Sequence, residues 1–158
     1  MKPLLAAAGM LLCAAGGAAG AQADEGQADG APSCSPGIDE IAKGFISLFY
    51  DQGKVREAYE TYVAEDYIQH NPHATDGRDA AIAFLEPFYQ RNPGHRMIVH
   101  RVIVQAPYIV VHLHGRTSPE DRGAAAVDIL RVENCKIAEH WDVTQPVPEH
   151  SANNNGMF

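Results

Sequence analysis

Apolar residues follow two different periods along the chain, and the change of period comes near Gly94. Before that point they recur every three or four residues, which is the spacing of one face of a helix. This pattern predicts three helices, over about 36–53, 55–63 and 77–91. Asn-Pro-Gly at 92–94 ends the third of them, since Pro and Gly interrupt helices.

After Gly94 apolar and polar residues tend to alternate, which is typical of strands. Four strands are predicted, over 97–105, 108–117, 124–132 and 137–145. The gaps between them are short enough for hairpins, so we expect an antiparallel sheet. Helices followed by a meander indicate an α+β domain with helices covering one face of a curved sheet of about four to six strands.

The N-terminal segment has the features of a secretory signal peptide. Lys2 is followed by an uncharged apolar stretch, and Ala21-Gln22-Ala23 fits the small-x-small cleavage rule. We therefore expect residues 1–23 to be a signal peptide, 24–35 a flexible leader and 36–158 the domain. The expected location is periplasmic or secreted.

Composition restricts the partners of the domain. The formal net charge is −8, and removal of Lys2 with the signal peptide makes the mature chain more acidic. An acidic domain without a basic cluster is not expected to bind nucleic acid or anionic membranes. No later apolar run is long enough to cross a membrane.

Asp128 and several histidines are the candidate chemical groups. Asp128 stands between Val127 and Ile129 in a predicted strand, and desolvation there would make its carboxylate a better general base. His112 and His114 share one face of the preceding strand, although alternation alone leaves open which face lines the interior. Structural roles for these residues remain the alternative, with Asp128 paired to an Arg or a His.

Several segments resemble the SnoaL-like polyketide cyclase family of the nuclear-transport-factor-two-like superfamily. The resemblance extends over about 35–158 and rests on Tyr67–Pro72, His112–His114, Val127–Asn134 and Lys136–Val143. It implies a cone-shaped α+β fold around an apolar pocket. It also implies acid–base chemistry by a pocket Asp and His, without metal or other cofactor.

The resemblance implies particular roles for residues of this chain. Asp128 matches the strand Asp of the family, His112 or His114 matches the strand His, and His70 matches a His at the pocket mouth. The chain departs from the family in its signal peptide and in Cys135, where the subgroup usually has Gly. Pocket walls are expected from four aromatic residues, Tyr67, Phe84, Phe88 and Trp141.

Two functions follow from these observations. The first is an enzyme without a cofactor, a cyclase, lyase or isomerase that acts next to the carbonyl of a small molecule. The alternative is a periplasmic protein of the same fold that binds a small ligand without turnover. A metal site is not expected, because His112-x-His114 alone is a weak ligand motif.

Two further expectations concern assembly and covalent structure. The resemblance and the two apolar faces of the second strand predict a homodimer through the outer face of the sheet. Cys34 and Cys135 are the cysteines that remain after export, so a disulfide between them is expected in an oxidising compartment.

Overall fold

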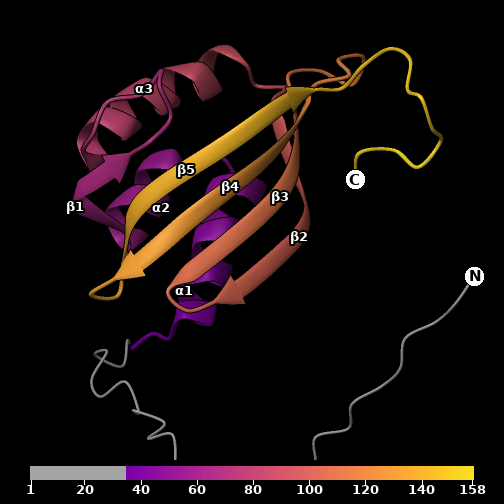
Figure 1. Ribbon diagram of the computed structural model, residues 1–158. Helices are drawn as coiled ribbons and strands as arrows, with labels where there is room; N and C mark the ends of the chain where they lie inside the picture. The colour runs from indigo at the N-terminus through magenta and orange to yellow at the C-terminus, as the bar shows by residue number, and fades with distance from the viewer. Residues whose placement is uncertain (1–34) are drawn as a thin grey trace, which may run out of the picture. The chain divides into compact units, whose positions relative to one another are not determined.

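The computed structural model describes residues 35–158, in which helices cover one face of a curved five-stranded sheet (Figure 1). No helix in this part of the chain is long and apolar enough to span a membrane. The elements in chain order are α1 (Ile38–Phe45), the π-helix η1 (Ile46–Asp51), α2 (Val55–Tyr62), β1 (Val63–Gln69), α3 (Arg78–Arg91), β2 (Arg96–Gln105), β3 (Tyr108–Arg116), β4 (Ala124–Glu133) and β5 (Lys136–Pro146).

The sheet is mixed, with strand order β1-β5-β4-β3-β2. The four strands from β2 to β5 form the expected antiparallel meander, whereas β1 runs parallel to β5. The prediction of a wholly antiparallel sheet is therefore wrong for this one pair. The sequence pattern gave no strand directly after the second helix, but β1 begins there, and its residues Val63, Ile68 and Gln69 pair with β5 about 70 residues later.

The core lies between the helices and the inner face of the sheet. On the helical side, Ile41 and Phe45 of α1 are buried, since their spacing places them on one side of the helix. On the sheet side, Ile109, Val111 and Leu113 of β3 are buried, and the intervening residues point outward. The inner face of β3 is thus the aliphatic one.

Two β-bulges among the antiparallel strands change which residues face inward. One lies in β2 between Val99 and Arg101, and the other lies in the β4–β5 pair beside Val132. In the second, Val132 pairs with Ile137 while Arg131 pairs with Glu139, so Ala138 is the extra residue. As a result, both Ile137 and His140 lie on the inner face although their numbers differ in parity.

Candidate functional site

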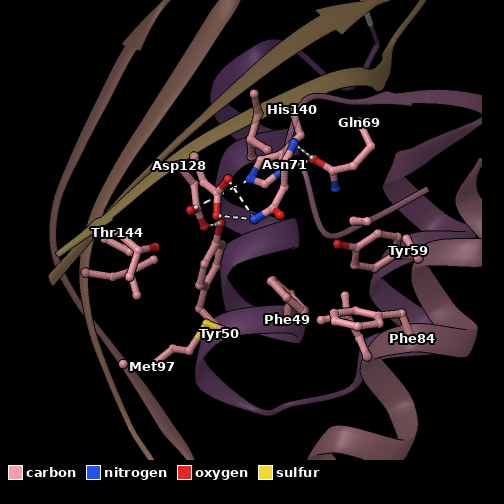
Figure 2. Close-up of a pocket in the computed structure, with 18 of the residues that line it drawn as sticks. Phe49, Tyr50, Tyr59, Gln69, Asn71, Phe84, Met97, Asp128, His140 and Thr144 are labelled. Carbon is pink, nitrogen blue, oxygen red and sulfur yellow. Dashed lines mark hydrogen bonds and ion pairs between the residues drawn. The ribbon is translucent and has the colours of Figure 1, made fainter. Parts of the chain in front are cut away.

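A cavity of about 430 Å³ lies between the helices and the inner face of the sheet. Most of its wall is apolar and much of it is aromatic. A minority of polar side chains, with Asp128, His140 and Asp142 among them, comes mainly from β1, β4, β5 and the loop after β1. Figure 2 shows Asn71, Asp128 and His140 gathered at one end, with Phe49, Phe84 and Met97 lying apart from them.

Asp128 is the centre of the polar end. Its side chain is 14% exposed and points inward from β4, in register with buried Val111 of β3. The hydroxyl of Tyr50 donates a hydrogen bond of 2.6 Å to Asp128 Oδ2. Tyr50 comes from the π-helix η1, which therefore supplies a donor to a carboxylate on the opposite layer. Hydrogen bonds to an ionised acceptor are the stronger kind, so this contact fixes the orientation of the carboxylate.

His140 stands beside Asp128 on the neighbouring strand β5. Its Nε2 lies 3.7 Å from Asp128 Oδ1, and its side chain is also 14% exposed. Its Nδ1 lies 2.7 Å from Gln69 Oε1, an oxygen that also accepts a hydrogen bond from the Asn71 backbone N–H. An amide oxygen can only accept, so His140 Nδ1 carries a hydrogen.

The Nδ1–H tautomer of His140 determines how protons can be shared between His140 and Asp128. Neutral His140 presents the lone pair of Nε2 toward Asp128 Oδ1, so a favourable contact between them requires a proton on one of the two groups. The pair can therefore hold one exchangeable proton at the end of an aromatic cavity. That is the chemical requirement of a general acid–base site.

Asp142 is a second carboxylate on the same face. It pairs directly with Asp128 across β4 and β5, and both residues line the cavity. The Asn71 side-chain amide lies 2.9 and 2.8 Å from the two carboxylate oxygens of Asp142. Asn71 Oδ1 in turn accepts the backbone N–H of His73, which directs the amide nitrogen toward Asp142.

Burial and the charge of Asp128 affect the nearby tyrosines. Desolvation, followed by the negative charge of Asp128, holds the pKa of Tyr50 well above its ordinary value. The pKa values of Tyr59 and Tyr67 are also raised, chiefly by burial. These hydroxyls stay protonated at neutral pH and act as donors or as neutral wall.

The structure separates the catalytic residues expected from the sequence. Asp128 lines the cavity, but the prediction that His112 or His114 shares that cavity is wrong. They lie on the outer face because the alternate residues of β3, Ile109, Val111 and Leu113, fill the inner one. Their rings stack instead on Phe158, at centroid distances of 5.8 and 4.4 Å.

His70 and Trp141 also lie outside the cavity. Their rings stack on each other with centroids 4.6 Å apart, and His70 Nε2 is 2.7 Å from Glu139 Oε1. Glu139 and Trp141 lie on the outer side of β5, the two residues flanking inward-facing His140. His70, directly after β1, thus contacts the outer face of β5.

The four expected aromatic wall residues divide evenly. Tyr67 and Phe84 line the cavity, the latter with 58% of its surface exposed. Phe88 packs instead against Tyr89 and His95, and Trp141 is on the outer face. Sequence reasoning missed His140 and Asp142 as cavity residues, and it also missed Tyr50, Gln69 and Asn71.

One protein-family model matches this chain. The model of the SnoaL-like domain matches residues 42–140, more than half of the chain. The chain belongs to the SnoaL-like family. No curated protein matches this SnoaL-like chain.

Solved structures share the fold of this SnoaL-like protein. A candidate isomerase of the SnoaL-like family from Agrobacterium tumefaciens is 15% identical with a TM-score of 0.56, over 67% of this chain and 95% of that chain. A candidate polyketide cyclase from Bacillus cereus is 21% identical with a TM-score of 0.57, over 70% and 78%. A candidate SnoaL-like polyketide cyclase from Jannaschia is 16% identical with a TM-score of 0.54, over 66% and 85%. At these identities the likeness shows the fold, and activity must be argued from the site.

Proposed function

We propose that this SnoaL-like protein is an enzyme that transfers a proton at a carbon next to the carbonyl of a small molecule. The observation that carries the proposal is the Asp128–His140 pair at the polar end of an aromatic cavity. Reactions of this type include aldol ring closure, lyase cleavage and isomerisation, all of which pass through an enolate. The family and the cavity support a small-molecule ligand, and the pair supports the chemistry.

Each polar group has a role in this proposal. Asp128, oriented by Tyr50, uses Oδ1, the oxygen that Tyr50 does not bond, to remove the proton from the carbon. The electron pair of the broken C–H bond moves into the carbonyl, and the enolate oxygen accepts a hydrogen bond from protonated His140 Nε2. Gln69 holds the His140 ring through Nδ1, with Nε2 on the side of Asp128 at the polar end of the cavity. Protonated Asp128 then gives the proton back, to a different carbon in an isomerisation or to the new alkoxide oxygen in an aldol closure.

Deuterium exchange tests the proposal without knowledge of the natural substrate. The protein is incubated in D₂O with a panel of small aromatic and aliphatic ketones, and loss of the α-proton signal is followed by NMR. We expect exchange to be accelerated by the protein and reduced about 10²–10⁴-fold in Asp128→Asn, the usual contribution of a positioned base. Asp39→Asn in the exposed first turn of α1 is the control and should exchange like the wild type.

The result also separates the enzyme from the alternative of a ligand carrier. A protein that binds a ketone but never exchanges its α-proton would contradict the enzyme. In that case the same cavity would serve for binding alone, and Asp128→Asn would leave the affinity for a neutral ligand nearly unchanged.

A further inference from the structure

The charges around the cavity are unbalanced. Asp128 and Asp142 both line it, while Lys and Arg are absent from its lining among the described residues. The only lining side chains that can become cationic near neutral pH are histidines, and His140 is the one paired with a carboxylate. Within the described cavity lining, His140 is thus the one group beside these two carboxylates that can carry a positive charge.

The two carboxylates also face each other directly. Asp128 and Asp142 are cross-strand partners in the antiparallel β4–β5 pair, and both side chains are partly buried. Like charges at directly opposed positions destabilise a sheet, and the effect is larger where the surroundings are apolar. Tyr50 donates a hydrogen bond to Asp128 and Asn71 donates to Asp142, but both donors are neutral. A cation between or beside the carboxylates would remove this repulsion.

Aromatic rings complete the surroundings. Phe45, Phe49, Tyr59, Tyr67 and Phe84 all line the same cavity. The faces of aromatic rings attract cations, most strongly where water is excluded. Burial is the main cause of the raised pKa values of Tyr59 and Tyr67, and the negative charge of Asp128 adds to both shifts.

We propose that the cavity selects a small apolar molecule that carries a protonated amine, and that Asp142 is the residue that binds the ammonium group. This proposal concerns the same site as the proposed function and adds the substrate class to it. Asp128 remains the base in that function, and Asp142 supplies the charge that distinguishes amines from neutral or acidic molecules. Carboxylates, phosphates and other anions are disfavoured, because two carboxylates and no Lys or Arg line the described cavity.

Calorimetric titration with matched probes tests the proposal on the wild-type protein in an amine-free phosphate buffer. The probes are benzylamine, 2-phenylethylamine and tryptamine, each compared with its alcohol, together with 3-phenylpropanoate as an anionic counterpart. We expect at least one amine to bind about tenfold or more tightly than its alcohol, and we expect the propanoate not to bind. Equal affinity for amine and alcohol, tighter binding of the propanoate, or failure of every amine to bind would overturn the proposal.

A variant assigns the preference to one residue. Asp142→Asn keeps the shape and removes one charge, so the amine should lose about tenfold in affinity while its alcohol is unaffected. Asp39→Asn removes the same charge from the exposed first turn of α1 and should bind like the wild type. An unchanged amine preference in folded Asp142→Asn would contradict the role of Asp142. If this variant does not fold, the wild-type ranking of probes decides.

Binding and turnover can fail separately. Amine preference without deuterium exchange would support the inference and contradict the proposed enzyme. Exchange of neutral ketones without any amine preference would support the enzyme and contradict the inference.

Discussion

Tyr50 donates a 2.6 Å hydrogen bond to Asp128 although the two residues are 78 positions apart and belong to opposite layers of the domain. The bond joins the π-helix η1 to the centre of β4. The bond therefore stabilises the packing of the helices on the sheet and also orients the carboxylate.

Replacement of Tyr50 by Phe should destabilise the fold. The change deletes one donor to a partly buried carboxylate, for which a loss of about 1.5–3 kcal/mol in the free energy of unfolding is expected. Urea unfolding measures it. Tyr108→Phe, at a hydroxyl on the exposed end of β3, is the control and should lie within about 0.5 kcal/mol of the wild type. A Tyr50→Phe variant as stable as this control would show that the bond contributes no net stability.

Stability should fall steeply at alkaline pH. Burial raises the pKa of Tyr50, Tyr59 and Tyr67 above their ordinary value near 10. Below that pH the hydroxyls are protonated in the folded and unfolded states alike. Above it the unfolded chain releases protons that the folded chain retains, so the free energy of unfolding decreases by about 1.4 kcal/mol per tyrosine and pH unit.

Absorbance at 295 nm and circular dichroism check this prediction together. The buried tyrosines should ionise only as the ellipticity is lost. Ionisation of all six tyrosines near pH 10 with the fold intact would contradict it.

The tautomer of His140 should depend on Gln69. Gln69 Oε1 accepts the hydrogen on His140 Nδ1, so ¹⁵N NMR of the neutral ring should report Nδ1–H in the wild type. Gln69→Leu removes the acceptor, and the hydrogen should move to Nε2 in a substantial fraction of molecules. Gln145→Leu, an exposed position in β5, is the control and should leave the spectrum unchanged. A wild-type ring protonated at Nε2 when neutral would contradict the assignment.

Cys135→Gly should stabilise the reduced protein. Asn134 and Cys135 form the β4–β5 turn with φ values of 49° and 62°, a left-handed conformation that Asn tolerates and Cys does not favour. Glycine there should raise the free energy of unfolding by about 1 kcal/mol under reducing conditions, as measured by urea unfolding. A loss of stability in reductant would contradict this view of the turn.

The same variant tests the Cys34–Cys135 disulfide, which stays a prediction because Cys34 lies outside the described residues. If the bridge forms, Cys135→Gly should destabilise the oxidised protein, typically by about 2–4 kcal/mol. Cys34→Ala should then show the same loss in oxidant and little change in reductant. Two free thiols per mature chain, titrated without reduction, would end the disulfide hypothesis.

The predicted homodimer can be tested on the outer face of the sheet. Val143 of β5 is 71% exposed and Ile103 of β2 is 60% exposed, and both point away from the helices. If this face joins two copies, light scattering should give a dimer at micromolar concentration for the wild type and a monomer for Val143→Glu. Ala83→Glu, exposed on α3, should remain dimeric. A wild-type monomer would contradict the expectation.

Local patterns predicted most of the elements but not how they pair. The three helices and the four strands of the meander agree with the structure within a few residues, because their apolar spacing is regular. Strand β1 was missed as a strand of the sheet. Its parallel partner lies far along the chain, and no short-range turn signals such a pair.

Of the polar groups of the candidate site only Asp128 was predicted, because alternation fails at a bulge. A hairpin of constant register would place Trp141 opposite Asp128. The extra residue Ala138 shifts the pairing by one, so Asp142 takes that position and His140 lies inward as well. For β3 the sequence offered two faces, one with histidines and one aliphatic, and the requirement to fill the core selected the aliphatic one.

The parallel pairing of β1 with β5 has a consequence for the order in which the chain can fold. Val63 finds its partner at Ile137, so the first strand of the sequence has no neighbour in the sheet until the last strand has been synthesised. That last strand also carries His140 and Asp142. Contacts of such long sequence separation form slowly. The synthesis of the C-terminal residues therefore completes the sheet and the polar end of the cavity in the same step. A chain that ends before residue 136 would lack both the β1–β5 pair and the polar residues of β5.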